Sequence, residues 1–162
     1  ILLALARARA GGLTHVTASF IRIDITTQDW TGVVAGRSFD AVLSLAVLHH
    51  IPGREARQRL LVQMAGLLTA PGCLIISTWQ FMSSERLRRK IVPWSAVGLA
   101  EHQVDEGDYL LDWRRGGYGL RYCHLIGEDE LRRLCQSAGL VIADLFLADG
   151  GLNLYAVAHT PR

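Results

Sequence analysis

Two periodicities of apolar residues run along this chain. Residues 16–25 roughly alternate between apolar and polar positions, which is typical of a β-strand. Phe39–Leu45 and residues 73–81 are almost continuously apolar, as parallel strands covered on both faces are. Between these two runs, residues 54–68 carry leucine and methionine at helical spacing. The pattern predicts a strand, a second strand, a helix and a third strand.

The flanking segments continue this alternation. Residues 1–10 have the pattern of a helix end, stopped by two glycines, and residues 127–140 predict a helix with acids in its first turn. Residues 141–149 and 152–160 predict two strands of a hairpin that turns at Gly150. Strands that alternate with helices predict an α/β, Rossmann-like fold: a mostly parallel sheet with helices on both faces and a C-terminal antiparallel hairpin.

Length and composition narrow the class. With 162 residues, we expect a single domain over 1–162, in which 82–119 is an irregular insertion near the substrate face. Half of the residues are apolar, a fifth are charged, and the net charge of +2 does not demand a polyanionic partner. The three cysteines match no disulfide or metal pattern, which favours reduced thiols and a cytoplasmic protein. No apolar run reaches the length of a membrane span.

Candidate chemistry follows from the ends of the strands, because ligands of open α/β sheets bind beyond the carboxyl ends. The first strand ends at Asp24 and Ile25, and the second runs through Ser44 to His49 and His50. The alternatives are simple: Asp24 can cap its own turn, and the histidines can be solvated or hydrogen-bonded. A metal site is disfavoured, because adjacent side chains diverge and no third ligand has a matching spacing. A serine nucleophile is disfavoured too, since the glycines of a nucleophile elbow are absent around "LSLAV".

Taken in order, these segments resemble a known family. "FDAVLSLAVLHHIP", the amphipathic helix after it, "LTAPGCLIIST" and the closing hairpin resemble the C-terminal part of class I S-adenosylmethionine-dependent methyltransferases. The chain departs from that family at Cys73, where a glycine is usual. The resemblance implies a methyltransferase that uses S-adenosyl-L-methionine as its cofactor.

The resemblance also implies roles for single residues. Asp24 would meet the adenine amine and Ile25 would offer backbone to the ring. His49 would lie between cofactor and acceptor, whereas His50 would turn away. The methionine part of the cofactor would be approached by the backbone of Ser44, Leu45 and Ala46.

Two parts of the family pattern are missing from this sequence. They are the glycine-rich loop of the first strand and the acid of the second strand that binds ribose. The chain has no initiating methionine, and "ILLALARARA" resembles the segment that follows the ribose-binding acid. We therefore expect a fragment that lacks the first βαβ part and that, by itself, is inactive and binds the cofactor weakly or not at all.

A second resemblance concerns the acceptor. "DYLLDWRRGGYGLRYCHLIGEDELRRLCQSAG" resembles a segment of the tRNA methyltransferases that esterify 5-carboxymethyluridine at the wobble position, with Cys123 in place of a tyrosine. It implies that Arg121 clamps the acceptor carboxylate, with Tyr122 and His124 on the other face of the segment. The basic run at 86–90 would meet phosphates. Alternatively, Arg121 pairs with an acid, Asp112 or Glu128, and the run is a solvated helix face.

Three functions remain open at this point. The first is a methyltransferase that acts on modified tRNA, and the second is a methyltransferase of the same fold for a small-molecule acceptor. The third is a non-catalytic, methyltransferase-like module that binds a small partner protein. Under the first two, His49, Arg121, Tyr122 and His124 are the candidate catalytic residues.

Overall fold

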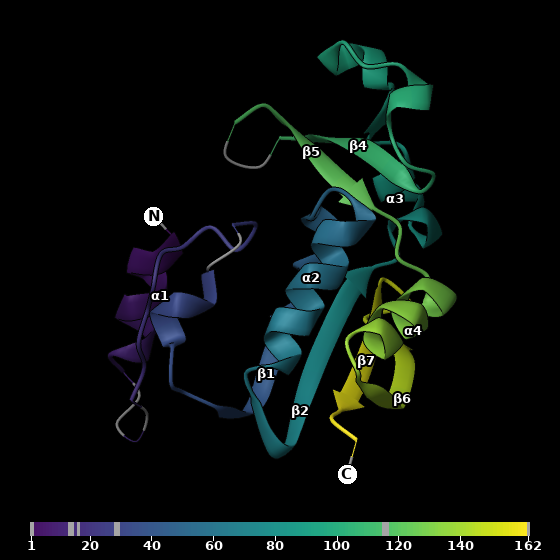
Figure 1. The fold of residues 1–162 in the computed structure, drawn as a ribbon. Helices are drawn as coiled ribbons and strands as arrows, with labels where there is room; N and C mark the ends of the chain where they lie inside the picture. Colours follow the sequence, from purple (N-terminus) through teal and green to yellow (C-terminus); the bar gives the residue numbers. More distant parts are fainter. Residues whose placement is uncertain (1, 13–14, 16, 28–29, 115–116, 162) are drawn as a thin grey trace. The chain divides into compact units, whose positions relative to one another are not determined.

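The computed structural model describes residues 2–12, 15, 17–27, 30–114 and 117–161, which form two compact units, Ile1–Gly36 and Arg37–Arg162. Figure 1 shows the course of the chain. The first unit contains helix α1 and a 3-10 helix. The bounds of these elements are Leu2–Ala10 and Trp30–Val34.

The predicted strand at 16–25 is wrong over the part that can be described. Residues 17–24 adopt no regular secondary structure, and Val16 lies outside the described residues. An alternating pattern needs a neighbouring strand for its backbone hydrogen bonds. Among the described residues of this unit, none forms a strand that could supply them.

A four-stranded sheet forms the centre of the second unit, in the order β1-β2-β7-β6. β1 and β2 are parallel, whereas β7 is antiparallel to both of its neighbours, β2 and β6. The predicted α/β class and the C-terminal hairpin are confirmed, and the sheet of this unit is mixed. The strand bounds are Phe39–Leu45 (β1), Leu68–Trp79 (β2), Val141–Ala148 (β6) and Asn153–His159 (β7).

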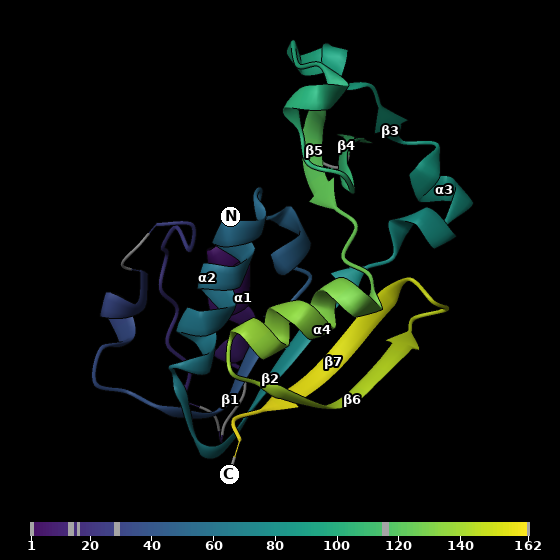
Figure 2. The same ribbon diagram turned by 45° about the vertical axis from the view of Figure 1, so that its right-hand side comes forward.

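Helices α2 and α4 pack against each other on one face of this sheet (Figures 1 and 2). They cover Arg54–Ala65 and Glu128–Ser137, and their buried leucines pack toward sheet residues such as Ile76. Because side chains alternate between the faces of a strand, the other face of β1 carries Leu43 and Leu45, which are 58% and 48% exposed. Within the second unit, the described helices cover the opposite face of β1, and coverage of the face that carries Leu43 and Leu45 stays a prediction.

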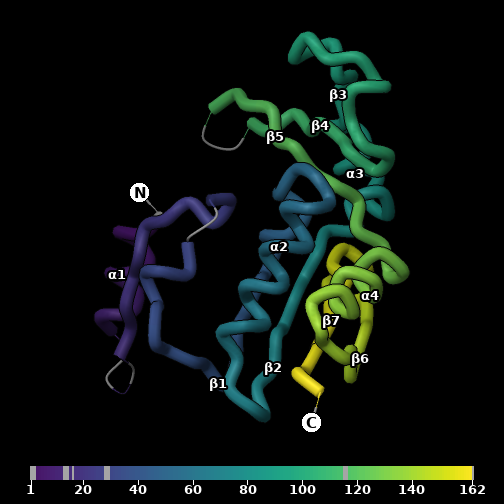
Figure 3. Tube along the Cα trace, in the orientation of Figure 1, coloured from purple at the N-terminus to yellow at the C-terminus, as the bar shows by residue number. Residues whose placement is uncertain are grey.

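The segment between β2 and α4 folds into a second, three-stranded sheet in the order β3-β4-β5 (Figure 3). Much of the predicted irregular insertion thus has regular structure, including the short helix α3. The segment between β2 and α4 also has a small core, built around Phe81, Leu87, Leu111 and Cys123. The bounds are Glu85–Arg88 (α3), Ile91–Val92 (β3), Asp108–Trp113 (β4) and Gly119–His124 (β5).

This second sheet is anchored to the carboxyl end of β1. β5 contacts the short 3-10 helix Leu48–His50 that follows β1. Within the described part of the chain, no helix is long and apolar enough to cross a membrane.

Candidate functional site

The backbone turns sharply where β1 ends. Ala46 adopts the left-handed conformation with φ of 55°, which is strained for a residue with a side chain. Its N–H is held by two acceptors on β2, the carbonyl oxygen of Ser77 at 3.1 Å and the Ser77 Oγ at 3.0 Å. The Ser44 side chain is buried, and its Oγ has no hydrogen-bond partner among the described residues. The end of β1 therefore offers a buried hydroxyl that protein groups leave free.

His49 is fully buried just beyond this turn. Its Nδ1 accepts a hydrogen bond from the backbone N–H of Trp79 at 3.3 Å, which places the imidazole proton on Nε2. Nε2 is buried and has no partner among the residues that the structure describes. Burial, with the nearby charges of His50 and Arg121, lowers the pKa of His49 to about 3. His49 is thus a neutral hydrogen-bond donor whose Nε2 has no acceptor among the described residues.

His50 points to a different partner. Its Nδ1 donates a hydrogen bond to the carbonyl oxygen of Tyr122 on β5, at 2.9 Å. Burial lowers the pKa of His50 as well, with Arg121 adding to the effect and the bond to Tyr122 opposing it. The two histidine rings nevertheless lie together, with centroids 4.2 Å apart. His50 therefore links the turn after β1 to the second sheet.

A pocket of about 300 Å³ opens between the carboxyl end of β2 and the second sheet. Trp79 and Trp113 stack in it with ring centroids 6.2 Å apart. The guanidinium carbon of Arg121 lies 3.8 Å from the centre of the Trp113 ring and 5.8 Å from that of Trp79. Lys90 Nζ lies 5.2 Å from the centre of the Trp113 ring. We call this site the tryptophan pocket; its lining residues are Trp79, Arg86, Leu87, Lys90, Trp113 and Leu152.

Arg121 is not neutralised by an acid at this site. Within the described part of the chain, it forms an ion pair with neither Asp112 nor Glu128, the two alternatives that the sequence left open. Asp112 instead pairs with Arg114, at 2.8 Å. The pocket lining includes cations and no carboxylate, so its chemistry suits a ligand with a flat ring and a negative charge.

Tyr122 and His124 lie on the opposite face of β5, as strand alternation requires. The Tyr122 hydroxyl donates to Asp108 Oδ1 at 2.6 Å, and His124 Nδ1 lies 2.6 Å from the same oxygen. His124 Nε2 lies 2.9 Å from Glu130 Oε2 on α4. Burial lowers the pKa of His124, but the hydrogen bonds to Glu130 and Asp108 outweigh it and raise the pKa above its ordinary value.

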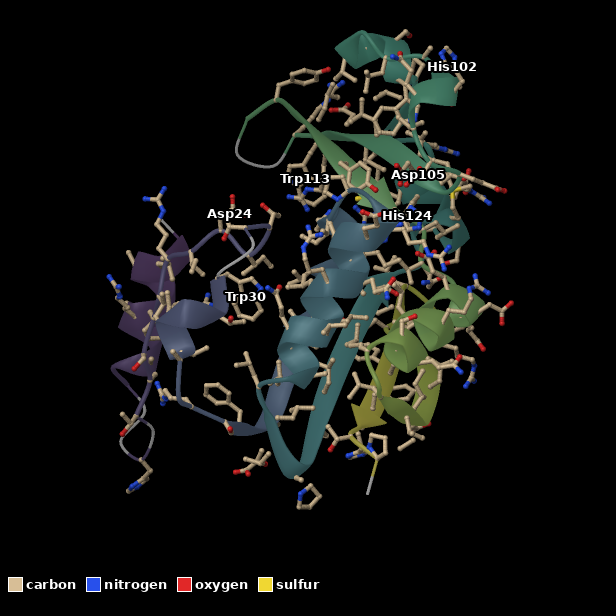
Figure 4. The ribbon with its side chains drawn as sticks, in the orientation of Figure 1. Asp24, Trp30, His102, Asp105, Trp113 and His124 are labelled. Atoms are coloured by element: carbon tan, nitrogen blue, oxygen red, sulfur yellow. The ribbon has the colours of Figure 1, made fainter. Side chains whose placement is uncertain are left out.

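Both side chains are thus fully engaged with protein groups. Burial, with the hydrogen bond to Asp108 second, raises the pKa of the Tyr122 hydroxyl, so it remains protonated. Figure 4 shows Trp113 and His124 on β4 and β5 of the second sheet. The catalytic roles predicted for Tyr122 and His124 stay predictions, and the contacts support a role in positioning β5.

Asp24 and Ile25 belong to the first unit. Asp24 is exposed, and its Oδ1 accepts hydrogen bonds from the Thr26 N–H at 2.9 Å and the Thr26 hydroxyl at 2.7 Å. These bonds lower the pKa of Asp24. The geometry is that of the simpler alternative, an acid that caps its own turn. The predicted contacts of Asp24 and Ile25 with adenine stay predictions.

Sequence reasoning missed three charged residues that hold the site together. They are Arg57, Asp108 and Glu130. The burial of Arg57 could have been predicted from the sequence. It lies one turn before Leu60 and Leu61 on the apolar stripe of the helix, where a charged side chain needs buried partners. Nothing in the sequence pattern distinguishes Asp108 and Glu130, because each lies in an acidic segment typical of a solvent-exposed surface.

The sequence is similar to parts of two known proteins. No family model matches the chain. It is 36% identical over 107 residues to a protein of Encephalitozoon cuniculi whose name assigns it only to the methyltransferases, a match over 66% of this chain and 47% of that protein. It is 35% identical over 83 residues to "Probable tRNA methyltransferase 9B" of Homo sapiens, over 49% of this chain and 18% of that protein. The chain thus spans about half, or less, of the length of these relatives.

Solved structures extend the likeness to nearly the whole chain. An S-adenosylmethionine-dependent methyltransferase from Methanosarcina mazei superposes with a TM-score of 0.67 at 18% identity, over 98% of this chain and 76% of that one. A second, from Clostridium acetobutylicum, gives 0.66 at 11% identity, over 98% and 70%. A Burkholderia thailandensis methyltransferase with bound S-adenosylhomocysteine gives 0.58 at 19% identity, over 98% and 56%. The chain therefore has the fold of the class I S-adenosylmethionine-dependent methyltransferases.

Proposed function

We propose that this protein is an S-adenosylmethionine-dependent methyltransferase that forms a methyl ester on a carboxymethylated wobble uridine of tRNA. Residues 1–162 act in it as one methyltransferase domain. The fold and the sequence similarity to proteins named as tRNA methyltransferases support the reaction class. The tryptophan pocket is the observation that supports this acceptor, because it combines a base-sized aromatic stack with cations that form no ion pair with an acid among the described residues.

The residues present at the end of β1 fit the cofactor. A buried hydroxyl and a buried imidazole N–H without partners are costly unless a ligand satisfies them. Ser44 Oγ and His49 Nε2 are two such groups, and both lie at the carboxyl end of β1, where ligands of this fold class bind. Ser44, Leu45 and Ala46 would hold the methionine part, and Asp24 and Ile25 the adenine.

The mechanism needs positioning more than proton transfer. When bound, S-adenosylmethionine would supply the methyl group to an acceptor oxygen, and its sulfur would keep the electron pair of the broken carbon–sulfur bond. Arg121 holds the acceptor carboxylate through two parallel N–H donors. Trp79 and Trp113 hold the ring to which that carboxylate is attached and exclude water from it.

The state of the histidines favours a carboxylate over a hydroxyl acceptor. A hydroxyl must lose a proton as it attacks, which calls for a base whose pKa lies near the working pH. The pKa of His49 is lowered to about 3 and that of His50 is also lowered, so neither is suited to that task. A carboxylate is already ionised at neutral pH and needs no such base.

The proposal is tested by nucleoside analysis of tRNA from a strain that lacks the gene. We expect the wobble methyl ester to be absent in that strain and restored by the wild-type gene. An Arg121→Ala copy should fail to restore it, whereas Arg114→Ala, which removes an exposed arginine from the same hairpin, should succeed. Unchanged nucleosides in the deletion strain would rule the tRNA substrate out.

A small-molecule carboxylate is the second candidate, because a pocket of about 300 Å³ has the volume of a small-ligand site and would also hold a free single-ring acid. Under this alternative, deletion leaves tRNA nucleosides unchanged, yet Arg121→Ala still abolishes methyl transfer to the small acceptor. Under the third hypothesis, a non-catalytic module, purified whole protein binds no S-adenosylmethionine in calorimetry.

A further inference from the structure

Arg57 is a buried cation that no part of the proposed reaction uses. It lies on α2, and its side chain is 2% exposed. One terminal nitrogen donates to the carbonyl oxygen of Ile51 at 3.1 Å and to the Tyr122 hydroxyl at 3.3 Å. The other lies 3.5 Å from Glu130 Oε1 on α4. A guanidinium taken out of water this far is stable only with such partners.

The charges around Arg57 balance. When His124 is protonated, its ring and Arg57 carry two positive charges that face Asp108 and Glu130, with the Tyr122 hydroxyl between Arg57 and Asp108. His124 then donates from both ring nitrogens, so its 3.2 Å approach to Arg57 is not a hydrogen bond. The two cations are instead held together by Glu130, which each of them contacts.

The partners of Arg57 carry the two halves of the candidate site. Ile51 directly follows His49 and His50, and Tyr122 directly follows Arg121. One rigid, planar side chain thus fixes the distance between the histidine turn and β5.

We propose that Arg57 is a positioning residue for methyl transfer: through Ile51 and Tyr122, it sets Arg121 and the tryptophan pocket against the turn that carries His49. The proposal rests on the proposed function, since the distance it fixes matters only if the cofactor and the acceptor meet there. Lysine cannot replace arginine in this role, because an ammonium group lacks the planar fork that reaches three partners at once.

The test compares Arg57→Lys with Arg59→Lys in the whole protein. Arg59 is exposed on the same helix, so its variant is the matched control. We expect Arg57→Lys to raise the acceptor KM and to lower kcat/KM for the acceptor about 10-fold to 100-fold, as small misplacements in active sites do. The KM for S-adenosylmethionine should stay within about twofold, because the end of β1 is held by Ser77. A loss of kcat with both KM values unchanged would mean a smaller folded fraction only and would overturn the proposal.

A second readout does not depend on catalysis. The protein has four tryptophans, so the indole N–H signals can be assigned in a ¹⁵N–¹H spectrum. Because Arg121 lies over the Trp113 ring, we expect the Trp113 signal to shift in Arg57→Lys and not in Arg59→Lys. An unmoved signal in a folded variant refutes the positioning role. A moved signal in a protein that methylates no acceptor instead refutes the proposed function alone.

Arg57→Lys removes buried contacts and can unfold the protein. In that case, Glu130→Gln is the variant that tests the proposal. The Glu130 side chain contacts Arg57 and is 23% exposed, and glutamine keeps its shape. A raised acceptor KM with a moved Trp113 signal supports the proposal. A folded Glu130→Gln variant with neither change overturns it.

Discussion

Ser44 and Ser77 are both buried where β1 and β2 end, yet they are used differently. Ser77 Oγ accepts the N–H of the strained Ala46, whereas Ser44 Oγ has no partner among the described residues. A hydrogen bond contributes about 1 kcal/mol to folding, and an unpaired buried hydroxyl contributes nothing of that kind. The pair therefore separates a structural serine from one that is kept for a ligand.

We expect Ser44→Ala to leave the free energy of unfolding within about 0.5 kcal/mol of wild type while weakening S-adenosylmethionine binding about 2-fold to 10-fold, the value of one hydrogen bond. Ser77→Ala should instead lower the free energy of unfolding by about 1 kcal/mol. Urea denaturation and calorimetry of the whole protein measure both. A destabilised Ser44→Ala with unchanged cofactor affinity would show that this hydroxyl serves the fold.

Trp113 allows a second substitution at this scale. Base stacking on an aromatic ring contributes about 1 to 3 kcal/mol. We expect Trp113→Ala to raise the acceptor KM about 10-fold or more, whereas Trp113→Phe, which keeps a flat ring, should recover most of that loss. Steady-state kinetics with saturating S-adenosylmethionine check this. Equal KM values for the two variants would mean that the acceptor does not lie on this ring.

At the scale of elements, the local sequence pattern predicted a strand or helix correctly where its packing partner lies in the same compact unit. β1, β2, α4 and the hairpin at Gly150 were predicted near their observed places, because their periodicity matches the faces that they bury. The strand prediction was wrong at 17–24. An alternating pattern is compatible with a strand, but it does not show that a neighbouring strand is present to pair with it. The second sheet was missed although a Gly-Gly pair, which is a turn signal, stands between β4 and β5, because the whole segment was interpreted as an irregular insertion.

The contact between β5 and α4, through His124 and Glu130, predicts a pH dependence of the stability of the fold. The pKa of His124 is raised above the ordinary value of 6.5, so its contribution to stability is present below pH 6.5 and is lost as the pH rises through the raised value. His49 and His50, with lowered pKa values, are neutral throughout this range. Burial raises the pKa of Cys123 to about 12 and that of Cys135 to about 11, so these thiols matter only above about pH 9.

Wild type should therefore lose free energy of unfolding between pH 6.5 and 9, and His124→Gln should lose markedly less over the same range. His102→Gln is the control, because His102 is exposed on a surface 3-10 helix and should keep the wild-type slope. Urea denaturation at several pH values measures the slopes. Parallel slopes for wild type and His124→Gln would show that His124 is not protonated in the folded protein.

For the whole molecule, the balance of charge is nearly even, with 17 basic and 15 acidic side chains. Net charge therefore does not favour RNA binding, and any affinity for RNA must come from a local cluster of basic side chains. Arg86 and Lys90 line the tryptophan pocket, Arg88 is exposed next to Leu87 on α3, and Arg89 is paired with Glu85. A basic rim next to a base-sized pocket fits an acceptor nucleotide that remains part of a strand.

The basic side chains beside the pocket predict a different salt dependence of binding for tRNA and for a free small acceptor. Each phosphate that a basic side chain neutralises adds about 0.7 to 0.9 to the steepness with which log affinity falls against log salt. Arg88→Ser should reduce that slope for tRNA by about this amount and weaken binding, while Arg59→Ser on α2 should not. Filter binding at several salt concentrations measures both. A small acceptor has no neighbouring phosphates for Arg88 to meet, so an unchanged slope in Arg88→Ser would remove this rim from the tRNA interface and favour the small-molecule alternative.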